Sequence, residues 1–231
     1  SAALAALTEK VFVTSRLFAG YSGALDAGVL ARLIAALPQG APGATAAHKR
    51  YDAAACAVEI PADVGFCALG HNLYALGSSY SGACPVLSSL VSYGYLWNMV
   101  RVQGGAYGTG MNVRRSGDIF CYSYRDPNLD NTRAVFSTIA DFIEDFAAQG
   151  MPLDDIIIGA VNTTDPLLDP AGVCESQCVR ALKGVTPEEL AKTRHELLAT
   201  KPADLAAMAD VLRKYAREGK FCTFSGTNGG A

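Results

Sequence analysis

Two kinds of hydrophobic spacing alternate along this chain and predict a mixture of strands and helices. Short runs rich in β-branched and aromatic residues indicate strands, whereas apolar residues three and four positions apart indicate helices. The predicted strands are Val11–Phe18, Ala54–Ile60, Phe66–Leu76, Tyr107–Val113, Ile119–Tyr124 and Phe221–Phe224. The predicted helices are Asp26–Leu37, Pro85–Val100, Asn131 or Thr132 to Phe146, Leu153–Val161, Gly172–Leu182, Pro187–Ala199 and Pro202–Glu218. We therefore expect an α+β fold, with a mainly antiparallel sheet and helices packed on one face.

Turn residues indicate how these elements connect. Pro61-Ala-Asp63 separates two strands that we expect to pair, and Arg114-Arg-Ser-Gly117 is a polar turn of hairpin length. Asp126-Pro-Asn128 ends the strand that follows, and its turn chemistry accounts for all three residues. Gln39–Lys49 has the Gly/Pro/Ala content of a connection. No linker is long enough to divide the chain, so residues 1–231 are predicted to form a single domain.

Composition and charge exclude several classes of function. The 231 residues are 50% hydrophobic, which is enough for a core of ordinary size. No stretch approaches the roughly 18 uninterrupted apolar residues of a membrane span, and no export signal is present, so we expect no membrane partner. The formal charge is -3 without a dense Lys/Arg cluster, which argues against nucleic acid as a partner.

The cysteines indicate a reducing compartment. There are seven, an odd number, and in a chain of this size they do not suggest a disulfide framework. Cys174 and Cys178 have the i,i+4 spacing of one helix face, but no second cysteine or histidine pair completes a four-ligand metal site. We therefore predict buried, inert thiols and no metal site in this chain. Both a bacterial cytoplasm and an organelle matrix fit a reducing environment.

Two motifs resemble functional signatures without matching them. His195-Glu196 opens like the H-E-x-x-H zinc helix, but Ala199 stands where the second histidine belongs, and H-x-x-E-H is absent. The glycine-rich Gly104–Gly110 lacks the order and the lysine of a phosphate loop, and it precedes a predicted strand. Neither motif predicts a zinc or nucleotide site, and we assign no role to the three histidines.

Arg101 and Tyr107 flank the end of the helix that begins near Pro85. Gly104 and Gly105 lie between them and allow a sharp turn and a close approach of backbone. The two side chains can therefore converge on one ligand. A guanidinium and a phenol donate hydrogen bonds, which suits a peptide carbonyl or an oxyanion developing from it. A surface arginine and a packed tyrosine are the alternative interpretation.

These residues carry a resemblance to a known family. Val100-Arg-Val-Gln-Gly-Gly-Ala-Tyr-Gly108, followed by Ser123-Tyr-Arg-Asp-Pro-Asn128, resembles the signature of the second half of presequence proteases. These are zinc metallopeptidases of the pitrilysin/insulinase superfamily, peptidase family M16, in its subfamily C. Further similarity runs from the predicted strand near Val11 to the one near Phe221 and covers nearly the whole chain.

The resemblance implies a function for the chain. In that family two homologous halves close around an unfolded peptide, and the first half supplies the H-x-x-E-H zinc site. Residues 1–231 would then be the C-terminal, non-zinc-binding domain of a larger metalloendopeptidase, inactive alone, with the zinc-bearing N-terminal half and an unstructured peptide as its partners. Arg101 and Tyr107 would bind substrate and steady the tetrahedral intermediate, and Gly104 and Gly105 would let the strand approach it.

Two other functions remain open. A catalytically silent structural or processing-complex subunit of the same superfamily would keep this fold while lacking a zinc-bearing half in its parent polypeptide, but the retention of Arg101 and Tyr107 argues against it. A cysteine hydrolase needs a thiol, a histidine and an orienting group, and no local signature links such residues here.

Overall fold

The computed structural model describes residues 2–40 and 54–226 and divides the chain into two compact units. One unit combines residues 1–51 with residues 167–186, and the other combines residues 52–166 with residues 187–231. The larger second unit contains the sheet. This division describes compactness and not independent folding, so the expectation of a single domain stays a prediction. The predicted connection at 39–49 lies mostly outside the described residues.

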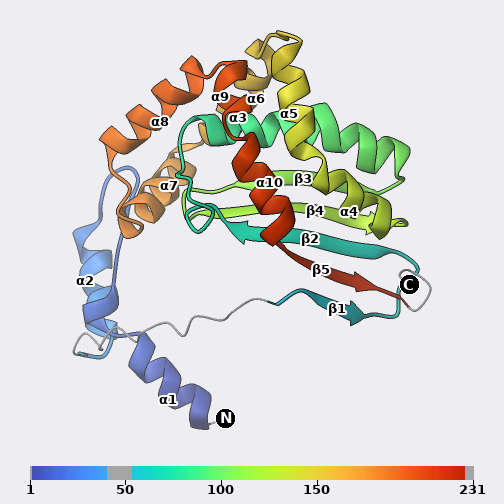
Figure 1. Ribbon diagram of the computed structural model, residues 1–231. Helices are drawn as coiled ribbons and strands as arrows, with labels where there is room; N and C mark the ends of the chain where they lie inside the picture. Colours follow the sequence, from blue (N-terminus) through green and yellow to red (C-terminus); the bar gives the residue numbers. More distant parts are fainter. Residues whose placement is uncertain (1, 41–53, 227–231) are drawn as a thin grey trace. The chain divides into compact units, whose positions relative to one another are not determined.

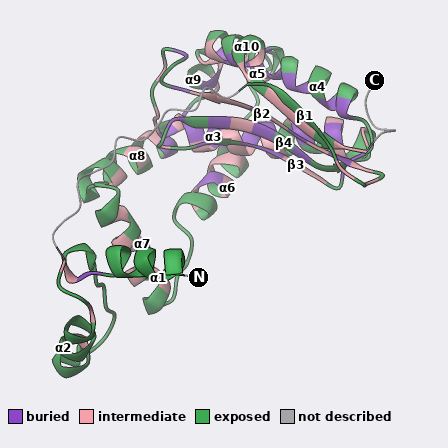
Figure 2. Cartoon of the chain, turned by 90° about the horizontal axis from the view of Figure 1, so that it is seen from below, coloured by how far each residue is buried: buried purple, intermediate pink, exposed green. Residues whose placement is uncertain are grey.

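The smaller unit is helical. It contains α1 (Ala2–Val11), the 3₁₀ turn η1 (Thr14–Arg16), α2 (Ala27–Ala36) and α7 (Pro170–Leu182). Asp26 caps α2 by accepting hydrogen bonds from the backbone N–H groups of Gly28 and Val29, as a helix start at this position requires. Almost all side chains of these helices are exposed or half-exposed (Figure 2).

The second unit is built on one five-stranded sheet (Figure 1). The strands are β1 (Cys56–Glu59), β2 (Gly65–Asn72), β3 (Gly108–Val113), β4 (Asp118–Asp126) and β5 (Lys220–Ser225). Their order is β1-β5-β2-β4-β3, and only the β1–β5 pair is parallel. The predicted α+β class with helices on a sheet is confirmed, and the sheet is mixed because of that one parallel pair.

Alternation along the strands gives the sheet one buried and one open face. In β4, Ile119, Cys121 and Ser123 are buried, whereas Tyr122 and Tyr124 between and after them are exposed. The helices of this unit are α3 (Ala83–Ser89), the π-helix η2 (Leu90–Gln103), α4 (Leu129–Ser137), α5 (Ile139–Ala148), α6 (Asp154–Thr164), α8 (Pro187–Ala199), α9 (Pro202–Ala206) and α10 (Ala209–Glu218). Helices α3, η2, α4 and α10 contact the strands directly. The open face leaves a row of aromatic rings on the surface.

Tyr215 of α10 connects the helices to the centre of the sheet through two hydrogen bonds. Its side chain is fully buried, its hydroxyl donates to the Leu69 carbonyl over 2.7 Å, and it accepts from the Cys121 N–H over 2.8 Å. Leu69 and Cys121 are direct neighbours on β2 and β4. Burial raises the pKa of Tyr215 well above its ordinary value, so the hydroxyl keeps the proton that it donates.

Two strand predictions were wrong. Val11–Phe18 forms the end of α1 and the turn η1, because this β-prone run has no neighbouring strand to pair with among the described residues. The strands on either side of Pro61-Ala-Asp63 exist but do not pair with each other. The closing strand β5 lies between them and pairs with both, which local sequence patterns do not encode.

Two predicted helices are interrupted. The segment that follows the β3–β4 hairpin forms α4 and α5, which are separated at Thr138, and the last helix is divided between α9 and α10. The cap of α4 also lies earlier than Asn131 or Thr132. Asn128 caps it, since its side-chain oxygen accepts from the Asn131 N–H over 3.1 Å.

Candidate functional site

The end of η2 is shaped by two glycines. Gly105 has a φ of +83°, its N–H donates to the Arg101 carbonyl over 3.0 Å, and the Ala106 N–H donates to the Val100 carbonyl over 3.1 Å. A Cβ atom at Gly104 would lie 2.5 Å from the Val100 carbonyl oxygen. Glycine is therefore required at Gly104 by contact and at Gly105 by backbone conformation. The turn brings the chain directly from Arg101 into β3.

Tyr107 directly precedes β3 and is largely exposed. Its N–H donates to the Tyr124 carbonyl over 3.1 Å, which fixes the backbone, while 67% of the residue surface is exposed. Its ring meets the Tyr124 ring edge to face at 6.0 Å, and Tyr124 meets Phe66 in the same manner at 5.2 Å. The aromatic neighbours hold the ring and leave the hydroxyl accessible.

Arg101 lies between two aromatic rings. Its guanidinium carbon is 3.9 Å from the centre of the Trp97 ring and 5.9 Å from the centre of the Tyr107 ring. Trp97 is one turn earlier on η2, and its ring is 6.3 Å from that of Tyr93, another turn earlier. The structure thus brings Arg101 and Tyr107 together, and we call Trp97, Arg101, Tyr107 and Tyr124 the Arg–Tyr cluster.

The sequence pattern missed the contribution of Trp97 and Tyr124. Hydrophobic spacing alone places Trp97 on the apolar face of its helix, yet 39% of its surface is exposed. Its spacing of four residues from Arg101 was the available signal, because that spacing places two helical side chains on the same face. The position of Tyr124 beside Tyr107 is set by the register of the hairpin, which pairs Tyr124 with Gly108.

Asp126 and Asn128 stabilise the chain behind the cluster. Asp126 is 1% exposed, and its carboxylate accepts from the Asn128 N–H over 2.8 Å and from the Thr132 hydroxyl over 2.6 Å. The preceding Arg125 has a φ of +50° at a bulge of the β2–β4 ladder. These contacts are those of a strand-to-helix turn.

The motif that resembles a zinc helix has a packing role. Glu196 of α8 accepts a hydrogen bond from the Gly82 N–H at the start of α3 over 2.9 Å. A Cβ atom at Gly82 would lie 2.2 Å from the Leu197 backbone nitrogen, so the two helices are in close contact there. Among residues 2–40 and 54–226, no three His, Cys, Asp or Glu residues lie close enough to hold a metal ion.

The cysteines are all free thiols. Cys67, Cys84 and Cys121 are buried as predicted, whereas Cys56 is exposed and the other three are half-buried. Burial raises the pKa of Cys67 to about 11 and that of Cys121 to about 12, so both are protonated at neutral pH. Protonated thiols are poor nucleophiles, and these two cysteines do not support a hydrolase mechanism.

Comparison with known proteins identifies the family. The pattern of the PreP C-terminal domain matches residues 56–224, which include the Arg–Tyr cluster and the whole sheet except Ser225 at the end of β5. The chain belongs to the PreP C-terminal domain family.

Relatives of this PreP C-terminal domain are much longer proteins. Presequence protease 1, chloroplastic/mitochondrial, of Arabidopsis thaliana is 34% identical over 157 residues, which cover 68% of this chain and 14% of the relative. Protein HypA of Clostridium perfringens is 32% identical over 160 residues, covering 69% of this chain and 16% of the relative. The matched part of the chain therefore spans only about a seventh of the length of these relatives.

Solved structures share the fold at low sequence identity. The peptidase M16 inactive domain from Pseudomonas fluorescens has a TM-score of 0.59 at 13% identity, covering 87% of this chain and 50% of that chain. A protease from Helicobacter pylori has a TM-score of 0.56 at 16% identity, covering 89% of this chain and 53% of that chain. In the described part of this chain, no helix is long and apolar enough to cross a membrane.

Proposed function

We propose that this chain is the substrate-binding C-terminal part of a zinc-dependent metalloendopeptidase that degrades short unstructured peptides. The observation that carries the proposal is the convergence of Arg101 and Tyr107 at the exposed end of the sheet, beside a turn that requires two glycines. Family membership supports a peptidase, and the names of the relatives support presequence-type peptides as substrates.

In this proposal, Arg101 and Tyr107 act on the peptide backbone. The guanidinium has a fixed set of N–H donors, and the Tyr107 hydroxyl adds one donor from the neighbouring strand. Both donors suit a scissile carbonyl, whose oxygen becomes more negative as the amide is attacked. Stacking on Trp97 orients the guanidinium before substrate arrives, so less reorganisation is needed during the reaction.

The zinc ion would be held outside this chain. The described residues do not form a metal cluster, so we place the zinc in the N-terminal half of the parent polypeptide, where it would activate the attacking water. This chain alone would then be inactive, and its partners would be that half and the peptide. The parent enzyme would act in an organelle matrix if eukaryotic and in the cytoplasm if bacterial.

Replacement of Arg101 in the full-length enzyme tests the proposal. We expect Arg101→Ala to lower kcat/KM for an unstructured fluorogenic peptide by about a hundredfold, as for loss of one oxyanion donor. Arg101→Lys keeps the charge without the planar fork and should recover only part of the activity. The matched control is Arg133→Ala. Arg133 is on α4 and also lies over an aromatic ring, that of Phe221 on β5.

The outcomes separate the competing functions. Full activity of Arg101→Ala would refute the assignment of the site while leaving the peptidase assignment intact. A wild-type full-length protein that cleaves no unstructured peptide in the presence of zinc would instead support the silent structural subunit.

A further inference from the structure

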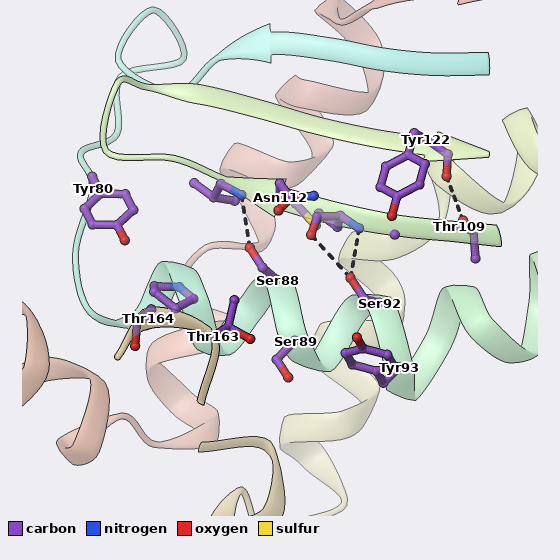
Figure 3. A pocket seen from close by; sticks show the side chains of 14 residues that line it. Tyr80, Ser88, Ser89, Ser92, Tyr93, Thr109, Asn112, Tyr122, Thr163 and Thr164 are labelled. Carbon is purple, nitrogen blue, oxygen red and sulfur yellow. Dashed lines mark hydrogen bonds between the residues drawn. The ribbon is translucent and has the colours of Figure 1, made fainter. Parts of the chain in front are cut away.

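A pocket with many polar side chains lies along the edge of β3 that pairs with no other strand (Figure 3). It has a volume of about 250 Å³, and we call it the β3-edge pocket. Its walls come from the loop before α3, from α3, η2, β3 and β4, and from the end of α6, all within the larger unit. Each of the 14 lining residues is uncharged. A pocket of this size fits one side chain better than a drug-sized molecule, which needs about 300 Å³ or more.

Serine hydroxyls already occupy part of the strand edge. The Ser92 hydroxyl accepts from the Met111 N–H over 2.9 Å and donates to the Met111 carbonyl over 3.3 Å. The Ser88 hydroxyl accepts from the Val113 N–H over 3.0 Å. These backbone groups are the ones that an added strand would use. A peptide at this edge therefore meets side chains instead of extending the sheet at these two positions.

Other polar groups of the pocket remain open to a ligand. The side chains of Ser89, Tyr93, Asn112 and Tyr122 line the pocket and make no hydrogen bond to another residue within the described ranges (Figure 3). Tyr122 lies against β3 at Gly110, where a Cβ atom would be 3.0 Å from the Tyr122 hydroxyl oxygen. Glycine at this position thus lets the phenol reach the strand edge. The pocket presents both hydroxyl groups and an amide that can donate or accept.

Two tyrosines of the pocket wall connect it to the proposed catalytic groups. Tyr93 lies in its wall and contacts Trp97, on which Arg101 stacks. Tyr122 lies in the opposite wall, two residues before Tyr124 on the same face of β4. A peptide whose carbonyl meets Arg101 would therefore place a nearby side chain at the β3-edge pocket.

We propose that the β3-edge pocket is a specificity subsite for an uncharged, hydrogen-bonding side chain of the peptide, such as that of Gln, Asn, Ser or Thr. The inference rests on the proposed peptidase function. A charged side chain would lose water without gaining an opposite charge from the lining. An apolar side chain would displace water from the open hydroxyl and amide groups without replacing its hydrogen bonds. The nearby Arg115 lies 5.1 Å from the Tyr80 ring, donates to Thr193, and further disfavours a basic side chain.

Replacing Asn112 by aspartate, which has the same shape but a negative charge, tests this inference in the full-length enzyme. The substrates are one unstructured peptide series in which Gln, Leu, Glu or Lys is placed at each position around the cleaved bond. We expect the wild type to favour Gln at one position. Asn112→Asp should raise the Lys-to-Gln ratio of kcat/KM at that position by about three- to fivefold, the effect of a solvent-accessible ion pair. Asn131→Asp, the same change on α4 outside the pocket, should leave the ratio unchanged.

A second variant tests the role of the phenol. Gly110→Ala forces Tyr122 away from the strand edge and should reduce the preference for Gln over Leu at the same position. Active enzyme with no side-chain preference at any position, or with a preference that Asn112→Asp leaves unchanged, would overturn the subsite while sparing the peptidase function. A wild type that cleaves none of the peptides would overturn both.

Discussion

Removal of the Trp97 ring should disorder Arg101 without removing it. The guanidinium lies 3.9 Å from the ring centre, and Trp97 is partly exposed, so the interaction belongs to the exposed class of cation–π pairs. Such pairs are worth about 0.5–1 kcal/mol. If Arg101 binds the transition state, Trp97→Leu should lower kcat/KM by about two- to fivefold, because that range corresponds to the lost energy. Trp97→Phe keeps an aromatic face and should lose less.

A double-mutant cycle separates positioning from general damage. The kinetics of cleavage of one fluorogenic peptide are measured for Trp97→Leu, Arg101→Ala and the double variant of the full-length enzyme. Two residues that act through one contact are not additive, so Trp97→Leu should have almost no further effect once Arg101 is alanine. The melting temperature of each variant controls for loss of fold. An equal loss in both backgrounds would refute the positioning role of Trp97.

Three further predictions concern the stability of the domain. Tyr215→Phe should lower the free energy of unfolding by about 1–3 kcal/mol in a urea titration, because the Leu69 carbonyl and the Cys121 N–H lose a buried partner. Gly105→Ala should lower the free energy of unfolding by about 1 kcal/mol in the same titration, since alanine disfavours a φ of +83°. An unchanged urea midpoint for either variant would contradict the corresponding prediction. Hydrogen bonding to Arg213 lowers the pKa of Glu144, so its stabilising effect should be present above the unfolded pKa of about 4.3 and disappear as pH falls through the lower folded pKa. Glu144→Gln should therefore flatten the acid limb of the stability curve, and parallel acid limbs would argue against this pair.

The fold was predictable where local patterns decide it. The β3–β4 hairpin and the helix that ends at Gly104 follow from turn chemistry and hydrophobic spacing, and the structure has both. The position of β5 between β1 and β2 depends on contacts between distant parts of the chain, which local spacing does not encode. In Val11–Phe18, local strand propensity predicts a strand that the structure does not contain, because the segment has no partner strand among the described residues.

The candidate site was predictable in its central pair but not in its surroundings. Arg101 and Tyr107 were found because a glycine turn joins a helix end to a strand. Trp97 was hidden because its spacing also fits a core position, and exposure is visible only after packing. The β3-edge pocket is assembled from segments that are far apart in sequence, including the end of α6, so no single motif indicates it.

The most direct test of the central claim is the effect of Tyr107→Phe on kcat and KM of the full-length enzyme. The substitution removes one hydroxyl and keeps the ring that contacts Tyr124. If this hydroxyl stabilises the transition state, kcat should fall by at least about tenfold with little change in KM or melting temperature. Tyr74→Phe, in the turn that follows β2, should retain full activity. An unchanged kcat for Tyr107→Phe would contradict the claim that this domain contributes directly to catalysis.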